Sequence, residues 1–348
     1  MALTKIFDPI PEFQDFREDS KKGQRDFGDR RDGKVYLYND HLVLAINVAI
    51  VTGRPLLLRG APGCGKSSVA YNIARVMGRC YYEKVISSRM QANDLCWRFD
   101  AIRRLGDAQV AGAAQKSTAL CQNNQFPWSS FHPYIEPEVF WWIFDAESAQ
   151  RRGLPEEEIL FFEPAQNPAV FYPNPDEPHH RAVVLLDEID KAEPDVPNNL
   201  LVVLGSMQFY VTEIQQTVTL ESRKQPSLLA PEDLPLIVIT TNEERTLPMA
   251  FLRRCVVYEF KPIKENQLVE IAKHIEGPKH LDLYEKIAKK MMRLTQKKSD
   301  SPHERLELNI AEYLDTVRAC LRMGGTGIYD QLIENILKYT TSKKSSYF

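Results

Sequence analysis

The sequence lacks any apolar run close to the eighteen or so residues that a membrane-spanning helix requires. Its first residues also lack the apolar stretch of a secretory signal peptide. We therefore predict that the chain has no membrane segment and is located in the cytoplasm.

Paired cysteines are lacking as well. The six cysteines are scattered and form no CxxC pair, so their spacing predicts no zinc site. Cys64 alone lies inside a motif, a glycine-rich loop, where its small side chain serves packing or, alternatively, redox sensing. We expect reduced thiols at all six positions, which are Cys64, Cys80, Cys96, Cys121, Cys255 and Cys320.

A strong charge of either sign is absent too. Lys and Arg number 44 against 47 Asp and Glu, which gives a net charge of −3. This balance provides no global signal for nucleic acid or for an anionic membrane, although it does not exclude a local basic patch. With 43% hydrophobic and 26% charged residues, the composition is typical of a globular protein with a sizeable core.

Five short apolar runs, each bounded by turn residues, are predicted to form buried strands. Helical periodicity occupies segments between them, beginning with a helix that starts near Asn39 and ends at Gly53. This alternation predicts an α/β fold with a parallel sheet and helices on both of its faces. The expected strands are Pro55–Arg59, Tyr81–Ile86, Ala182–Leu186, Leu236–Thr241 and Val256–Phe260.

The chain is predicted to have three parts. Residues 1–34 are polar and mixed in charge, which indicates an arm that is loosely ordered or packs on a neighbour. Residues 35–261 form the α/β core, with an insertion at about 101–180 whose aromatics are expected to build a satellite core rather than a base-stacking surface. Residues 262–348 predict an all-helical domain with helices at Glu265–Ile275, Leu281–Leu294, Asn309–Met323 and Tyr329–Tyr339.

A glycine-rich loop separates the first strand from the helix that follows it. Residues 60–67 read GAPGCGKS and match the pattern GxxxxGK[ST]. The glycines let the backbone approach phosphate groups closely, and the helix N-terminus adds a positive dipole. Lys66 would neutralise the β- and γ-phosphates, and Ser67 would offer its hydroxyl to Mg²⁺. We predict that ATP is bound by Gly60, Ala61, Pro62, Gly63, Cys64, Gly65, Lys66, Ser67 and Ser68.

A second motif ends the third strand, where VVLLDE carries two adjacent carboxylates. Asp187 is predicted to hold Mg²⁺, directly or through a water, together with Ser67. Glu188 is predicted to orient and activate the attacking water. The alternative is an acidic pair that caps the next helix, and we expect this capping role, or contact with a neighbour, for Asp190.

Two further sites follow along the chain. Asn242 ends the fourth strand, where its amide would sense the γ-phosphate and the lytic water, unless it is a simple turn residue. Arg253 and Arg254 precede the fifth strand and are either surface charges or arginine fingers that reach a neighbour's γ-phosphate in a ring. Arg254 is the preferred finger.

These segments resemble the MoxR-like group of AAA+ ATPases. The resemblance rests on GRPLLLRGAPGCGKSSVA, VVLLDEIDKAEPDVPNNLLVVL and ITTNEERTLPMAFLRRC, and covers roughly residues 34–100 and 180–340. It implies a five-stranded sheet of order 5-1-4-3-2, a helical lid and a ring, most often a hexamer. It also implies a hairpin after the second motif, which Gly205–Leu220 suits, and a protein client or a von Willebrand factor A-type partner.

The sequence departs from that group in two places. The insertion at about 101–180 is not typical and is a candidate for recognising a client or partner. The lid arginine that usually touches the γ-phosphate is missing near Asn309, and Arg305 or Arg318 are its candidate substitutes.

Three functions agree with these residues. The leading one is a ring-shaped ATPase that uses turnover to remodel or activate a partner protein. The second is the NTPase partner of a nucleic-acid-acting or defence system, which binding to DNA or RNA would distinguish. The third is a nucleotide-gated scaffold with little hydrolysis, against which the presence of Glu188 argues.

Overall fold

The computed structural model describes residues 6–9, 36–117, 130–155, 163–173, 178–220, 230, 233–298, 309–323 and 333–337. The predicted arm at 1–34 therefore lies outside the described residues except for residues 6–9. This short segment packs on the chain's own core: Phe7 is buried, and the backbone N–H groups of Ile6 and Phe7 donate to the side chain of Asn47 at 2.8 and 2.9 Å.

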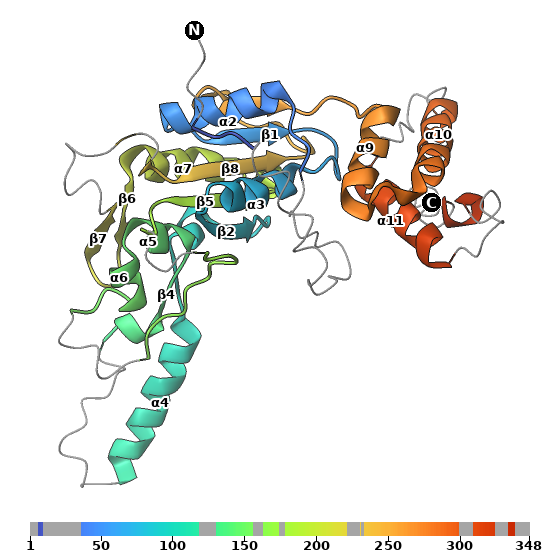
Figure 1. The fold of residues 1–348 in the computed structure, drawn as a ribbon. Helices are drawn as coiled ribbons and strands as arrows, with labels where there is room; N and C mark the ends of the chain where they lie inside the picture. The colour runs from blue at the N-terminus through green and yellow to red at the C-terminus, as the bar shows by residue number, and fades with distance from the viewer. Residues whose placement is uncertain are drawn as a thin grey trace.

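A five-stranded parallel sheet forms the centre of the molecule (Figure 1). Its strands lie in the order β2-β5-β8-β1-β9. If only these five strands are numbered in chain order, β5, β8 and β9 become the third, fourth and fifth strands. The order across the sheet is then 2-3-4-1-5, or 5-1-4-3-2 when it is counted from the opposite edge. The strands are β1 (Leu56–Arg59), β2 (Cys80–Val85), β5 (Ala182–Asp187), β8 (Leu236–Thr241) and β9 (Val256–Glu259).

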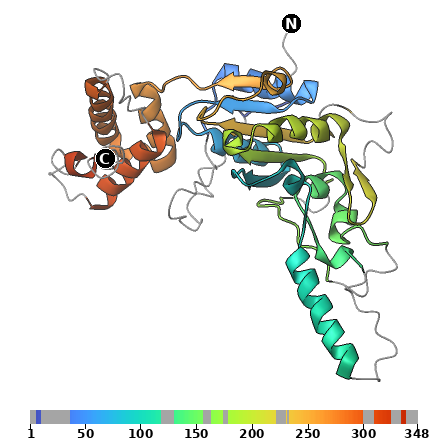
Figure 2. The same cartoon turned by 180° about the vertical axis from the view of Figure 1, so that it is seen from behind.

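The central strands β5 and β8 are almost entirely buried, and their sequences are continuous apolar runs. Such runs are typical of strands whose two faces are both covered by helices. On one face pack α2 (Asp40–Thr52) and α3 (Lys66–Val76), which share a core with Val183 and Leu185. The other face packs against α7 (Asp195–Ser206) through the alternate residues, such as Val184 and Leu186 (Figures 1 and 2). The helix α2 begins at Asn39, whose side chain accepts the N–H of Leu42, and ends at Gly53 in a left-handed conformation.

The insertion packs into the core between the sheet and α7, instead of forming the expected separate satellite core. Its aromatic residues Trp141, Phe140 and Phe144 are buried in the same cluster as the sheet. Buried Glu138 links the insertion to the central sheet through an ion pair with Lys84 on β2 at 2.6 Å, and it also pairs with Arg98 on β3 (Trp97–Phe99) at 2.5 Å. Two elements, η2 (Ala92–Leu95) and β3, directly precede the insertion, and β3 pairs with one of its strands, β4 (Ile135–Pro137). The insertion itself contains α4 (Ala101–Ser117), η4 (His132–Tyr134), β4, α5 (Val139–Phe144) and α6 (Ala146–Gln150).

The helix α4 extends away from the rest of the molecule (Figures 1 and 2). Three large apolar side chains on its described first turns are exposed: Ile102, Leu105 and Val110. Near the start of this helix, Arg104 lies over the ring of Phe131 at 4.1 Å. A cation–π contact thus anchors the base of the helix, while most side chains between residues 101 and 110 are exposed.

An antiparallel hairpin of β6 (Gln208–Val211) and β7 (Gln216–Thr219) follows α7, within the predicted span Gly205–Leu220. Its inner face packs on the insertion through Phe209, whose ring centroid lies 5.9 Å from those of Trp141 and Phe144. Phe209 also stacks on Trp97 of β3, with ring centroids 5.6 Å apart. The indole N–H of Trp97 donates to Glu213 at the hairpin turn at 3.0 Å. The hairpin and the insertion therefore form one packed unit.

The C-terminal part is helical in the described residues, as the periodicity predicts. It contains α9 (Glu265–Glu276), η10 (Pro278–His280), α10 (Leu281–Lys298), α11 (Ile310–Met323) and a short helix at 333–337. These helices have a core of their own around Leu268, Tyr284 and Tyr313. They lie beyond the carboxyl ends of β1 and β8 (Figure 1), the edge at which the glycine-rich loop also lies.

Candidate functional site

The loop between β1 and α3 wraps around the start of the helix. Gly63 and Gly65 adopt φ angles of 74° and 93°. Residues other than glycine rarely adopt this left-handed backbone conformation. Lys66 is buried at the first position of α3, and its ammonium donates to the carbonyls of Gly60 and Ala61 at 2.7 and 2.8 Å. In this arrangement the lysine is held inside the loop by backbone oxygens, at the place where a phosphate would compete for it.

Cys64 is half-buried within the same loop. Burial raises the pKa of its thiol, and the ammonium of Lys66 opposes this effect. A raised pKa disfavours the reactive thiolate, which supports the packing role over the redox-sensing role.

Two side chains from distant parts of the chain close on the loop. The amide of Asn309 lies over Gly63, since a Cβ built on that glycine would be 2.0 Å from the Asn309 Oδ1. The ring of Tyr36 approaches Gly65 from the opposite end of the sequence. Sequence patterns gave no signal for either contact, because both depend on how the first loop and the C-terminal helices fold back.

Ser67 and Asp187 meet directly at the tips of α3 and β5. The Ser67 hydroxyl donates to the Asp187 Oδ1 at 2.9 Å, and the Thr240 hydroxyl on β8 donates to the same oxygen. A hydroxyl and a carboxylate side by side are oxygen donors of the kind that Mg²⁺ prefers, so these residues fit the predicted ion. Thr240 was not predicted, although its place two residues before Asn242 on the same strand was a usable signal.

Glu188 follows Asp187 in a left-handed conformation with φ of 62°, unusual for a glutamate. Its N–H donates to the Thr240 hydroxyl at 2.9 Å, which secures the turn. Its carboxylate has two partners: Lys191 donates to Oε2 at 2.6 Å and Asn242 donates to Oε1 at 3.3 Å. Glu188 and Asn242, predicted from separate motifs, are thus brought together.

Asp190 does not cap the next helix, contrary to that expectation. It is buried, and its carboxylate accepts the backbone N–H of Glu244 at 2.9 Å and that of Asn242 at 3.4 Å. The turn after β5 directs this side chain toward the end of β8, where the backbone N–H groups of Asn242 and Glu244 lie. Asp190 therefore positions the loop that carries Asn242.

The same loop is tied to the first strand. Arg59, the last residue of β1, donates from Nε to Glu243 at 2.9 Å. Glu243 also has a left-handed φ of 61°. The ends of β1, β5 and β8 are therefore joined by side chains around the glycine-rich loop.

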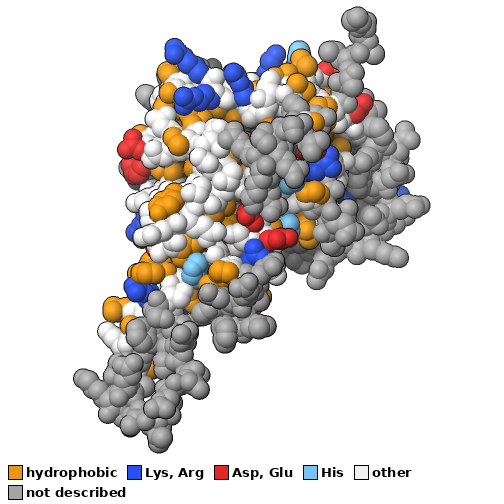
Figure 3. Space-filling model, turned by 90° about the vertical axis from the view of Figure 1, so that its left-hand side faces the viewer, with side chains coloured by type: hydrophobic (Ala, Val, Ile, Leu, Met, Phe, Trp, Pro, Cys, Tyr) orange, Lys and Arg blue, Asp and Glu red, His pale blue; other side chains and the backbone are white. Residues whose placement is uncertain are grey.

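Arg253 and Arg254 lie at the other end of the sheet. They are exposed in the turn between α8 (Met249–Leu252) and β9, at the amino ends of the strands. A four-residue strand spans roughly 13 Å, so these side chains start about that far from the glycine-rich loop of their own chain. Lys and Arg side chains gather on the upper part of this side of the molecule (Figure 3).

Only one of the two candidate lid arginines, Arg318, lies in the described residues, and its partner there is not the loop. Arg318 on α11 donates to Glu276 on α9 at 2.6 Å, an ion pair inside the helical part. Arg305 lies outside the described residues. The lid residue that meets a loop glycine is instead Asn309, which also caps α11 by accepting the N–H of Ala311.

These features define a P-loop protein of the AAA type. They are the glycine-rich loop between β1 and α3, the carboxylates at the end of β5, and Asn242 after β8. The AAA domain (dynein-related subfamily) matches residues 55–255, which is 201 of the 348 residues. The chain therefore belongs to this family. No curated protein matches the chain.

Solved structures give more distant likenesses. A point mutant of RuvB from Thermotoga maritima has 14% identity and a TM-score of 0.42, over 86% of this chain and 67% of that one. The same organism's RuvB Holliday junction branch migration motor has 15% identity, a TM-score of 0.38 and the same coverage. An inferred ATPase from Cytophaga hutchinsonii has 14% identity and a TM-score of 0.39, over 88% and 82%. At these scores the likeness carries no argument about function.

None of the helices in the described ranges combines the length and the apolar character needed to cross a membrane.

Proposed function

We propose that this protein hydrolyses ATP to ADP and phosphate. The observation that carries the proposal is the carboxylate of Glu188, which accepts the Asn242 amide and directly follows Asp187, the residue that contacts Ser67. A protein that only bound nucleotide would need the loop but not a base next to it. This base distinguishes the proposal from a nucleotide-gated scaffold.

The glycine-rich loop would bind the triphosphate through its backbone N–H groups and the N-terminus of α3. Lys66 now donates to two carbonyls of the loop, and these are weaker partners than phosphate oxygens. When ATP binds, the ammonium of Lys66 would move from these carbonyls to the β- and γ-phosphates. Ser68, next to Ser67 in the first turn of α3, would also contact the nucleotide.

Ser67 and Asp187 would hold Mg²⁺, which supplies charge neutralisation for the phosphates when it is bound. Their mutual hydrogen bond keeps the two oxygens together beforehand. The Thr240 hydroxyl supports the same carboxylate oxygen, so the ligand side chain is oriented before the ion arrives.

Glu188 would accept a proton from the attacking water, and Asn242 would orient that water and contact the γ-phosphate. The two side chains already lie within 3.3 Å of each other. Asp190 keeps this geometry by binding the backbone of the loop that carries Asn242.

Arg254, with Arg253 beside it, would complete the site of a neighbouring subunit in a ring. Support comes from their exposure at the amino ends of the strands, roughly 13 Å from their own loop. At this distance Arg254 would stabilise the transition-state charge in the site of another copy rather than in its own. A ring, most often a hexamer in MoxR-like proteins, allows this arrangement.

We further propose that turnover remodels or activates a partner protein, as the MoxR-like resemblance implies. The insertion supports this role, because α4 extends its exposed apolar residues away from the body of the molecule. A cytoplasmic client, or a partner with a von Willebrand factor A domain, fits this reading.

Replacing Glu188 by Gln tests the proposed function. The variant keeps the shape of the side chain but removes the base, so we expect steady-state ATP turnover to fall at least about a hundredfold. Nucleotide affinity measured by calorimetry should stay within a few fold.

Glu193→Gln provides a matched control, since it removes an exposed carboxylate just outside the site. Equal turnover by wild type and Glu188→Gln would contradict hydrolysis and favour the scaffold. DNA- or RNA-stimulated turnover would instead favour the nucleic-acid-acting alternative.

A further inference from the structure

Lys191 contacts the proposed catalytic base, although the sequence motifs assign it no role. It lies in η6 (Ile189–Lys191), directly after Glu188, with 41% of its side chain exposed. Its ammonium donates to the Glu188 Oε2 at 2.6 Å, a short, charge-assisted hydrogen bond. Such a bond stabilises the carboxylate in its present position.

Each oxygen of Glu188 thus has one hydrogen-bond partner. Lys191 holds Oε2 while the Asn242 amide holds Oε1. A carboxylate that is to take a proton from water needs a lone pair directed at that water. Each oxygen keeps a second lone pair, but the ammonium of Lys191 lowers the proton affinity of the carboxylate and fixes its direction. The ion pair with Lys191 is the stronger of the two contacts, so its loss would make Glu188 a stronger base that is free to turn toward the water.

A second acceptor for the lysine lies close by. The hydrogen bond to Glu188 is the largest cause of the raised pKa of Lys191; burial opposes it, and attraction to Glu188 and then to Glu244 adds to it. Glu244 is exposed, and its backbone N–H is bound to Asp190, so it stays near the same turn. Asp190 is the less suitable acceptor because its carboxylate already binds two backbone amides.

We propose that Lys191 is a positioning residue that restrains Glu188 in the resting protein, and that Glu244 takes over Lys191 when the base is released for catalysis. This inference rests on the proposed hydrolysis and adds a control step to it. It predicts that Lys191 lowers basal turnover, whereas a lysine needed to build the site would raise it.

Steady-state ATP turnover of Lys191→Met, Glu244→Gln and the double variant tests the proposal. We expect kcat of Lys191→Met to rise about fivefold, as the loss of one partly exposed ion pair would allow, with KM unchanged. Glu244→Gln should lower kcat, because the lysine loses its second acceptor. The double variant should match Lys191→Met, since without the lysine Glu244 has no part to play.

Two controls separate this role from a general effect. Lys289→Met removes an exposed lysine that pairs with Glu285 on α10, and its kcat should equal that of wild type. Lys191→Arg keeps the ion pair and should also stay near wild type. A kcat of Lys191→Met at or below wild type, in protein with unchanged circular dichroism and melting temperature, would overturn the restraint.

The failure of the proposed hydrolysis gives a different result. Turnover would then be insensitive to Glu188→Gln in every background, including Lys191→Met. A rise in Lys191→Met that Glu188→Gln abolishes supports both claims. No rise in Lys191→Met, with turnover still dependent on Glu188, rejects the restraint alone.

Discussion

At the scale of single residues, Gly63 is under two independent constraints. Its φ of 74° disfavours any side chain, and the space where a Cβ would lie is taken by the amide of Asn309. The first constraint belongs to the loop, and the second belongs to the docking of α11. A side chain at this position would therefore disturb both the proposed nucleotide-binding loop and its contact with Asn309.

Gly63→Ala is therefore expected to weaken ATP binding. Left-handed strain costs about 1–3 kcal/mol, which corresponds to about one order of magnitude or more in Kd. Calorimetric titration with ATP and Mg²⁺ measures the effect. Asn309→Ala in the same background should recover part of the affinity, because it removes the overlap but not the strain.

Gly205→Ala is the matched control for this experiment. Gly205 lies in α7, and no atom within 4 Å would meet its Cβ. Alanine is the better helix former, so this variant should bind ATP normally and melt at an equal or higher temperature. Equal affinity for Gly63→Ala and Gly205→Ala would contradict the packing described for the loop.

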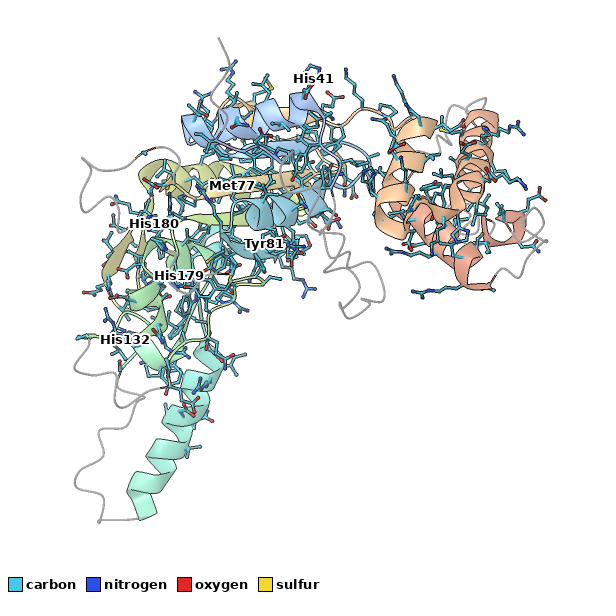
Figure 4. The ribbon with its side chains drawn as sticks, in the orientation of Figure 1. His41, Met77, Tyr81, His132, His179 and His180 are labelled. Carbon is cyan, nitrogen blue, oxygen red and sulfur yellow. The ribbon has the colours of Figure 1, made fainter. Side chains whose placement is uncertain are left out.

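At the scale of elements, the insertion is attached to the sheet by polar as well as aromatic contacts. The ring of His179 lies between two tyrosine hydroxyls. The hydroxyl of Tyr82 on β2 is 3.2 Å from the His179 Nδ1, and the hydroxyl of Tyr172 is 3.1 Å from its Nε2. Figure 4 places His179 and His180 among the elements of the insertion, away from the lid helices. This junction makes the attachment of the insertion sensitive to pH.

Burial, assisted by the neighbouring His180, lowers the pKa of His179 below its ordinary value. In the unfolded chain the pKa of a histidine is about 6.5, so below that pH the unfolded state binds more protons than the folded state. Stability is therefore fully present above about pH 6.5 and is lost as the pH falls, by at most about 1.4 kcal/mol per pH unit for one group.

The melting temperature should accordingly drop between pH 7 and pH 5, and His179→Gln should reduce this drop. Glutamine can keep one of the tyrosine hydrogen bonds but carries no charge. His41→Gln, which changes an exposed histidine at the start of α2, should leave the drop as it is in wild type. Identical pH dependence in all three proteins would contradict this role for His179.

At the scale of the whole molecule, the proposed site is divided between two copies of the chain. The base lies at the carboxyl ends of the strands and the arginines at the amino ends. Activity that requires a neighbour should rise more steeply than in proportion to protein concentration until the ring is complete. The division also allows a complementation experiment.

Arg254→Ala and Glu188→Gln should each be nearly inactive alone, yet a mixture should regain part of the turnover. In a mixed ring, an Arg254→Ala subunit keeps its base and can receive Arg254 from a Glu188→Gln neighbour. Turnover at fixed total protein, measured across mixing ratios, should peak near equal amounts. Normal turnover by Arg254→Ala alone would show that the finger is assigned to the wrong residue.

Much of the architecture follows from local sequence patterns. The apolar run before Asp187 predicts a strand buried on both faces, and the GxxxxGK[ST] loop predicts the tight turn before α3, because these features depend on neighbouring residues. Asn39 and Gly53 likewise mark the ends of α2 through their own side chain and backbone freedom. Such signals need no knowledge of the rest of the chain.

Contacts between distant segments could not be read in this way. The sequence determined the α/β order, the glycine-rich loop and the two carboxylates at the end of β5, since each arises from residues adjacent in the chain. Only the tertiary structure decided that Asp190 binds the Asn242 loop, that Asn309 covers Gly63 and that the insertion joins the main core. Such contacts depend on which strand ends and helices become neighbours, and this is set by the packing of the whole sheet and its layers.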